Sequence, residues 1–421
     1  MQASGRFCAA IVVACYLTLV LPVIADSGKS QRDLGETIVI GWNDLGMHCM
    51  NASFQHLAVL PPFNTIWAQV IYRGELDRLP QILLSDLTID YAFQNNTYSV
   101  GKTDFWSFED QLFGVSLPDN IGLTGHGLTG QMAQHGSGWS VEGVPLTPYD
   151  DSNWSIEVPY QLADLTLKNS VGTTLDMTTI VAPVSTEMHC EYCHTGGSGT
   201  EVAILQYHDE EESTDLINNQ PVLCANCHAS NALGMPGTPG VPSLSLAMHK
   251  KHGEENVMDC YVCHPGTTTQ CFRDVHRQHE MTCQSCHGST IEVYQSIEDG
   301  REPWLEEPNC GTCHGAGHAA EPGMLYRNSR GHGGVYCEAC HGSPHAIYPT
   351  LQPRDNLQSI RLQNHAGKID DCRVCHGYTP TEPGPHGFLA PQPAVPIDNV
   401  SVIVIILAAI TFMFLRFGNR H

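Results

Sequence analysis

One short pattern of reactive residues, Cys-x-x-Cys-His, occurs seven times between Cys190 and His376. Each copy places two thiols three residues apart and an imidazole directly after the second thiol. The copies, numbered here as motifs 1 to 7 in chain order, are not evenly spaced and do not form a strict repeat. Their residues are Cys190, Cys193 and His194; Cys224, Cys227 and His228; Cys260, Cys263 and His264; Cys283, Cys286 and His287; Cys310, Cys313 and His314; Cys337, Cys340 and His341; and Cys372, Cys375 and His376.

The pattern is the attachment signature of a c-type haem. Two thiols add to the vinyl groups of the porphyrin, and the adjacent imidazole is the proximal ligand of the iron. Paired Cys-x-x-Cys sequences also build zinc sites, and exported cysteines also form disulfide frameworks. Neither alternative explains a histidine after every pair. The sequence therefore predicts seven covalently bound haem c groups.

A six-coordinate iron also needs a distal ligand, and this region is rich in further histidines. Because His249 and His252 are three residues apart, they would share one helical face and could serve two neighbouring haems. The same holds for His276 and His279. Bis-histidine ligation would give low reduction potentials, although methionines leave a minority of His/Met sites open. The candidate distal ligands are His48, His249, His252, His276, His279, His318, His332, His365 and His386, with His189, His208 and His345 ranked behind them.

Residues 186–390 are predicted to form the haem domain. Only one Phe and one Trp lie between Cys190 and His376, and each motif has about 27 residues of chain. That is too little to surround each haem with its own side-chain core. We therefore expect the haems to be the core, with short helices that carry the motifs and loops that join them.

Residues 26–185 are different in composition and hold five of the six Trp residues. Short runs rich in β-branched and aromatic residues predict one mostly antiparallel, sandwich-like β domain. In the segment 42–49 (Trp-Asn-Asp-Leu-Gly-Met-His-Cys), a turn would present His48 at a strand end, either buried or as a haem ligand. Cys49 and Cys271 are the two remaining thiols of the mature chain, and they could form a disulfide or stay free.

The two ends of the chain carry targeting signals. Residues 1–25 resemble a secretory signal peptide, with an uncleaved anchor as the alternative, and both place the haem region outside the cytoplasm. Residues 391–399 form a Pro-rich linker, and the apolar residues 400–415 predict a transmembrane helix with its following arginines on the cytoplasmic side. This tail is also similar to cell-surface sorting signals that are cleaved. The predicted fold class is thus multidomain: an all-β domain, a haem-packed domain of short helices and loops, and one C-terminal transmembrane helix.

The formal net charge of −24 makes nucleic acid an unsuitable partner. An acidic surface suits basic redox proteins or a cationic electron acceptor outside the cell.

Across about residues 189–388 the chain resembles the multihaem c-type cytochromes exported by anaerobically respiring or metal-respiring microbes. The segments 331–345 and 384–387 (Gly-Pro-His-Gly) are similar to stretches common in these proteins, and segment 42–49 is similar to one in the N-terminal domains of some of them. The resemblance implies electron transfer through a chain of haems, in a periplasmic or cell-surface protein held by its C-terminal helix. One alternative is a reductase of nitrogen or sulfur compounds with one open haem, although no motif ends in the Lys of the pentahaem nitrite reductases. The other alternative is a self-assembling subunit of an extracellular haem filament.

Overall fold

The computed structural model describes residues 34–197, 199–321 and 323–387. The predicted signal peptide (1–25), linker (391–399) and membrane span (400–415) lie outside the described residues.

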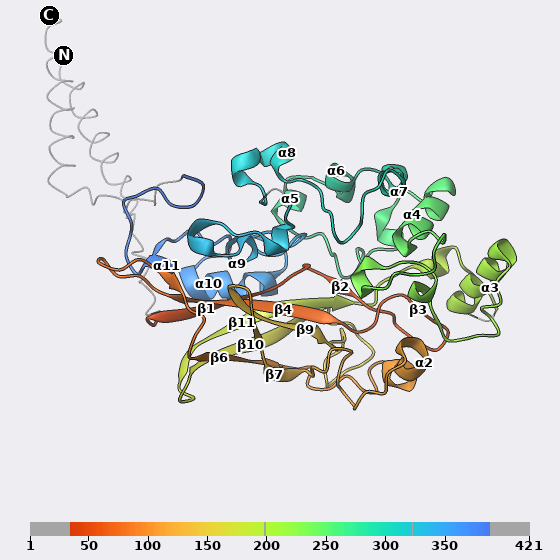
Figure 1. The fold of residues 1–421 in the computed structure, drawn as a ribbon, viewed down its shortest axis with the longest axis horizontal. Coiled ribbons are helices and arrows are strands. Elements are labelled where there is room, and N and C mark those ends of the chain that lie inside the picture. Colours follow the sequence, from red (N-terminus) through yellow and green to blue (C-terminus); the bar gives the residue numbers. More distant parts are fainter. Residues whose placement is uncertain (1–33, 198, 322, 388–421) are drawn as a thin grey trace, which may run out of the picture. The chain divides into compact units, whose positions relative to one another are not determined.

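Two five-stranded sheets form the lower layer in Figure 1. Adjacent strands in both sheets are antiparallel, except that β2 joins β11 in parallel. The first sheet has the order β1 (Thr37–Asn43), β4 (Asn64–Tyr72), β9 (Gly138–Val144) and β8 (Ala133–His135), with β5 (Gln81–Ile82) also paired to β4. The second has the order β2 (His48–Cys49), β11 (Thr174–Ser185), β10 (Tyr160–Asn169), β6 (Leu87–Phe93) and β7 (Thr129–Gln131).

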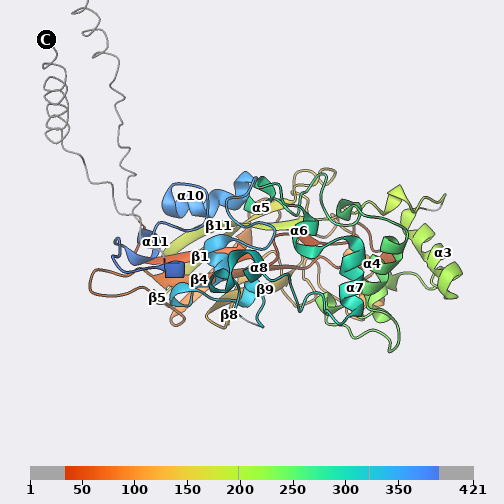
Figure 2. The same cartoon turned by 90° about the horizontal axis from the view of Figure 1, so that it is seen from above.

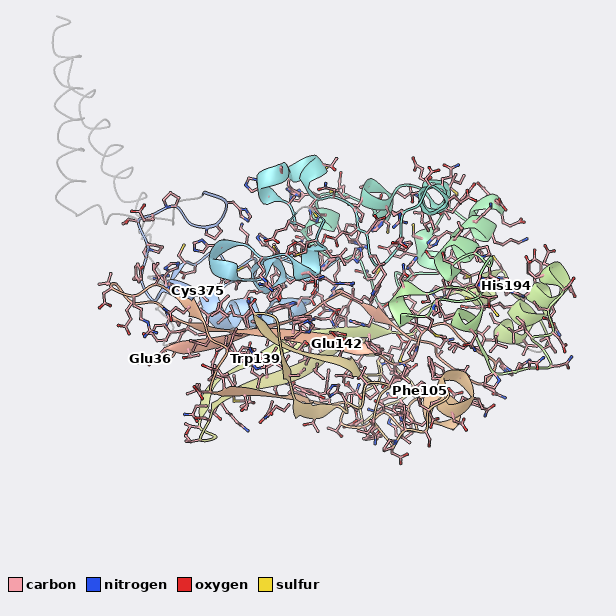
Figure 3. All side chains as sticks on the ribbon, viewed as in Figure 1. Glu36, Phe105, Trp139, Glu142, His194 and Cys375 are labelled. Atoms are coloured by element: carbon pink, nitrogen blue, oxygen red, sulfur yellow. The ribbon has the colours of Figure 1, made fainter. Side chains whose placement is uncertain are left out.

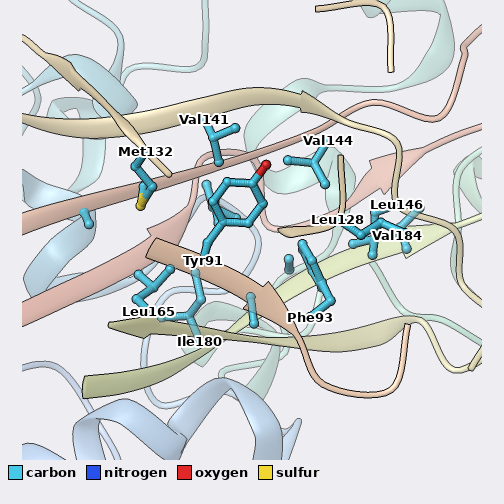
Figure 4. Close-up of a cluster of buried hydrophobic side chains, with 14 of the residues drawn as sticks. Tyr91, Phe93, Leu128, Met132, Val141, Val144, Leu146, Leu165, Ile180 and Val184 are labelled. Carbon is cyan, nitrogen blue, oxygen red and sulfur yellow. The ribbon is translucent and has the colours of Figure 1, made fainter. Parts of the chain in front are cut away.

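The main hydrophobic core lies between these sheets (Figure 4). Val39, Ile66 and Val141 reach it from the first sheet, and Tyr91 and Leu165 from the second. Strands with alternating inward side chains explain this arrangement, because each strand offers every second residue to the same face. Burial of these side chains is the dominant stabilising term for this layer.

Strand β1 also contributes to a second core on its other face. Ile38, Ile40 and Trp42 alternate with Val39 and pack against Tyr336 and other residues of the haem region. The strand is therefore covered on both faces, which explains its continuous apolar run. This second core joins the sheets to the helices above them.

The predicted fold class is wrong. All described residues belong to one compact unit, whereas the prediction separated a β domain from a haem domain. The two regions share the second core, and β12 (Val222–Leu223) pairs with β3 (Leu57–Ala58) across the predicted boundary. In the ranges that the structure describes, no helix is long and apolar enough to cross a membrane, so the transmembrane element of the predicted fold is not found there.

The haem region contains short helices joined by loops. Its helices are α3 (Thr200–Glu212), α4 (Leu244–Glu254), α5 (Val275–Gln278), α6 (Cys283–His287), α7 (Thr290–Glu298), α8 (Gly311–His314), α9 (Cys337–His341), α10 (Leu357–Gln363) and α11 (Arg373–His376). The 3-10 turns are η2 (Cys190–Tyr192), η3 (Cys224–Asn226), η4 (Asn231–Leu233), η5 (Cys260–Val262), η6 (Ala316–His318), η7 (Tyr326–Asn328), η8 (His332–Gly334), η9 (Pro353–Asn356) and η10 (Pro385–Gly387). Before them in the chain, the β region adds η1 (Phe105–Ser107) and α2 (Glu109–Phe113). Figures 1 and 2 show that α8 to α11 lie along one side of the sheets, whereas α3 lies beyond the end of the strands.

Candidate haem-binding sites

Each motif folds as a single helical turn. In motif 1 the backbone N–H of His194 donates to the carbonyl oxygen of Cys190 over 2.9 Å, and motifs 2, 3, 5 and 7 have the same bond. Motifs 4 and 6 lie in the helices α6 and α9. Residues three and four apart share a helical face, so both thiols and the imidazole of a motif point to the same side. This is the arrangement that attachment to one porphyrin requires.

Every motif histidine faces a second histidine from elsewhere in the chain. The distances between ring centroids are 6.2 Å for His194–His252, 6.1 Å for His228–His208, 6.2 Å for His264–His249, 6.0 Å for His287–His345, 5.8 Å for His314–His276, 6.1 Å for His341–His386 and 5.9 Å for His376–His332. Direct stacking of two rings would bring many such pairs closer. The similar distance between ring centroids in all seven pairs therefore indicates a common cause.

A metal ion between the two rings would account for this spacing. An imidazole–metal bond is about 2 Å long, and the ligating nitrogen lies roughly 1.1 Å from the ring centre, so two rings on one iron would be about 6 Å apart. Across the described ranges, no three His, Cys, Asp or Glu side chains come together as a metal site. Each motif offers two imidazoles that could ligate one iron and two thiols that could attach a porphyrin. This set fits a covalently attached, bis-histidine haem.

In several facing pairs, hydrogen bonds leave the second ring nitrogen available. When ring Nδ1 donates to a carbonyl oxygen, the other nitrogen, Nε2, is unprotonated and can bind a metal. Such bonds also fix the orientation of the ring. They join Nδ1 of His228 to Pro242 (2.9 Å), of His249 to Ser245 (2.7 Å), of His252 to Met248 (2.8 Å) and of His386 to Gly317 (3.3 Å).

Helix α4 presents facing histidines to two motifs. The hydroxyl of Ser243 accepts the N–H of Leu246 and caps the start of the helix. One turn apart on this helix, His249 faces His264 of motif 3 and His252 faces His194 of motif 1. The structure thus brings these two rings to neighbouring motifs, as their spacing in the sequence predicted.

A buried ion pair holds the segments that carry two other facing histidines, His276 and His345. The Arg273 guanidinium donates to both carboxylate oxygens of Asp355, over 2.7 and 3.0 Å, and both side chains are 1% exposed. The guanidinium also donates to the carbonyl oxygen of Gly46. The backbone N–H of Arg273 donates to the carbonyl oxygen of His345, and His276 follows three residues later. Arg273 therefore connects the sheet layer to the segments that present both rings.

Segment 42–49 contains a turn that packs against the haem region. Gly46 has a positive φ of +72°, and an added Cβ would lie 2.1 Å from the carbonyl oxygen of Pro344. The hydroxyl of Ser343 donates to the carbonyl oxygen of Asn43. The turn in segment 42–49 therefore packs directly against the turn that carries His345, whose own φ of +65° is rare for a side chain other than Gly.

Three predicted distal histidines have other surroundings. His48 is buried, and its Nε2 lies 3.0 Å from Asp44. His279 is exposed at the end of α5, because this helix stops at Gln278 and cannot place His279 on the face of His276. The Nε2 of His365 lies 3.3 Å from Asp370. Their spacing in the sequence did not reveal these local partners.

Two further candidates stack on other rings beside the motifs. His189 stacks on Tyr192 at 4.7 Å and lies between the carboxylates of Glu187 and Glu191. His318 stacks on His386 at 4.9 Å, so it lies behind the distal ring that faces motif 6.

His208 and His345, which the sequence ranked behind the others, both face motif histidines. His208 lies on α3, and its neighbour Tyr207 contacts His194 of motif 1. Helix α3 has 13 residues, lies between motifs 1 and 2 in the chain and carries His208. The position of His345 depends on a turn that packs against segment 42–49, which is far away in the sequence.

The motifs form one row with a definite order. Helix α3 connects motif 2 to motif 1 through His208 and Tyr207. From motif 1 onward, thiols of neighbouring motifs lie close enough to shift one another's pKa. These thiols are Cys190 and Cys263, Cys260 and Cys283, Cys286 and Cys313, Cys310 and Cys337, and Cys340 and Cys375. The row therefore runs 2–1–3–4–5–6–7, and Figure 3 shows His194 and Cys375 near its opposite ends.

Cys49 and Cys271 are both free thiols in this structure. Burial raises the pKa of Cys49 to about 12, and the nearby Cys271 thiol acts in the same direction. The two side chains are thus neighbours, and no disulfide joins them here.

Comparisons of the chain with family models, curated proteins and solved structures find no match.

Proposed function

We propose that this chain is an exported multihaem c-type cytochrome that transfers electrons along a row of seven covalently bound haems. The seven facing pairs of histidines are the observation that carries the proposal. A chance cluster of histidines would not give every motif one partner ring at nearly the same distance.

The chain's own residues would divide the work in each site. The two thiols of a motif anchor the porphyrin, and the motif histidine and its facing histidine ligate the iron. When bound, haem supplies reversible one-electron oxidation and reduction. Ligation by two histidines leaves no open position for a substrate, which favours electron transfer over catalysis at these sites. The facing histidines that we assign as distal ligands are His208, His249, His252, His276, His332, His345 and His386.

Export is part of the proposal, because the first 25 residues resemble a signal peptide and c-type haems are attached outside the cytoplasmic membrane. The partners would be other redox proteins or an extracellular electron acceptor. A strongly acidic chain suits basic partners.

Electron paramagnetic resonance of the oxidised holoprotein tests this function. We expect seven haems by mass and only low-spin signals. A substantial high-spin signal that shifts with nitrite or hydroxylamine would instead indicate an enzyme with an open haem, and filaments in electron micrographs would indicate a structural subunit.

Two variants of one short helix sharpen the test. Replacing His276 by Ala should convert one of the seven haems to a high-spin form, since this ring faces His314. Replacing the exposed His279 by Ala should leave all seven low-spin. Equal spectra for the two variants would refute the assignment of His276.

A further inference from the structure

The row of motifs ends at motif 7 beside an exposed hairpin, residues 73–80, which connects β4 to β5. The Arg73 guanidinium donates to the carbonyl oxygens of Val374 and Arg373, over 2.8 and 2.7 Å. The N–H of Gly74 donates to the carbonyl oxygen of Cys375 over 2.9 Å. The base of the hairpin is therefore bound to the backbone of motif 7 itself.

An open groove of about 520 Å³ lies between this hairpin and the residues that follow motif 7. Its lining includes Leu34, Leu76, Gly377 and Tyr378. The Tyr378 ring meets the His376 ring edge-on, with centroids 5.5 Å apart. An aromatic side chain of the groove thus contacts the proximal ligand assigned to motif 7.

The hairpin exposes two large aliphatic side chains and carries charges of both signs, including the exposed Arg78. Leu76 is 89% exposed and Leu79 is 69% exposed. Large aliphatic side chains gathered at one exposed point are typical of interaction sites. Glu36, Glu75 and Asp77 are exposed carboxylates beside them. An apolar centre with a charged rim is the usual composition of a protein–protein contact.

We propose that this groove and hairpin form the docking surface for a small basic redox protein, which exchanges one electron with the haem of motif 7. This inference rests on the proposed function. One haem loses an electron and the partner's redox centre gains it, or the reverse, and no bond is made or broken. A basic partner is favoured over a second copy of this chain, because two molecules with a formal charge of −24 repel each other.

Stopped-flow kinetics of the full-length holoprotein can test the surface, with a basic monohaem cytochrome c as the probe. The reduced holoprotein is mixed with oxidised probe at low and at moderate salt. In the groove variant, Glu36→Gln, Glu75→Gln and Asp77→Asn are combined. We expect its second-order rate constant to fall about tenfold at low salt, and its salt dependence to flatten.

A control variant removes the same charge from exposed positions away from motif 7. It combines Asp110→Asn, Asp119→Asn and Glu142→Gln, and Figure 3 shows Glu142 well separated from Glu36. We expect its rate constant to stay within about twofold of the wild type. A Leu76→Ser, Leu79→Ser variant should weaken probe binding while keeping the salt dependence.

The outcomes separate this surface from the proposed function. If dithionite reduces all seven haems but the groove and control variants transfer electrons equally fast, the docking surface is refuted and the haem row stands. If the purified protein holds no reducible haem, the proposed function itself fails. Wild-type kinetics in the double Leu variant would also contradict the docking surface.

Discussion

Glu187 offers a quantitative test of how the segment after β11 is joined to the loop that follows motif 3. Its carboxylate accepts the N–H groups of Thr268 and Thr269 over 2.8 and 2.7 Å, and also the hydroxyl of Thr269. Burial alone would raise the pKa of Glu187, but these hydrogen bonds outweigh it and hold the pKa at about 2. We predict that Glu187→Gln destabilises the folded protein.

The size of the effect follows from linkage. Lowering a pKa from 4.5 to about 2 corresponds to about 3 kcal/mol of stabilisation at neutral pH. Because the folded pKa is the lower one, this contribution is complete well above 4.5 and is lost as the pH falls toward 2. About 2 kcal/mol should remain at pH 3.5. Gln keeps one acceptor oxygen, so these values are upper limits.

Urea unfolding of the holoprotein, followed by circular dichroism at pH 7 and pH 3.5, measures the effect. The difference between the wild type and Glu187→Gln cancels the titrating groups that do not contact Glu187; the ring of His189 does contact it. Glu191→Gln is the matched control, because Glu191 also contacts His189 but its side chain is 52% exposed, and we expect about 0.5 kcal/mol or less. A Glu187→Gln difference that does not shrink at acid pH would refute this account.

Three further predictions use the same unfolding assay. Gly46→Ala should cost about 2 kcal/mol or more, since a Cβ would overlap the carbonyl oxygen of Pro344 at a positive φ, and no loss would contradict the close packing. Asp355→Asn should cost about 3–5 kcal/mol because it leaves the charge of Arg273 buried without its partner, and a loss below about 1 kcal/mol would argue against the pair. Burial, and then the nearby carboxylate of Asp44, raises the pKa of Glu338 well above its usual 4.5. The protonated side chain therefore contributes fully to the stability of the fold below pH 4.5, and this contribution is lost as the pH rises. Wild-type stability should therefore fall relative to Glu338→Gln above pH 4.5, by up to about 1.4 kcal/mol per pH unit, and parallel pH profiles would refute this.

The sequence predicted best what is local. The turn of each motif depends on five consecutive residues. His249 and His252 face two different motifs because both lie on one helix. The same spacing rule failed for His276 and His279 because α5 has only four residues. The prediction for His48 also failed, because its ring contacts the carboxylate of Asp44, four residues earlier in the chain.

The division into domains could not be predicted from composition. The change in aromatic content near residue 185 is real, but it marks a change of layer within one compact unit. Strand β1 carried the relevant signal: residues 38–42 are apolar on both faces, which a strand with one solvent face would not need. The side chains that cover its second face, such as Tyr336 and Leu362, are about 300 residues away.

Two of the facing histidines come from parts of the chain that do not adjoin the motif they face. His345 follows motif 6 but faces motif 4, and His332 precedes motif 6 but faces motif 7. Each such pair joins segments that other motifs separate, so a haem held by both rings would cross-link distant parts of the chain. Because only about 27 residues accompany each motif, these cross-links would replace the side-chain core that the haem layer lacks. Loss of one facing histidine should therefore disturb the two segments that it joins as well as the ligation of one iron.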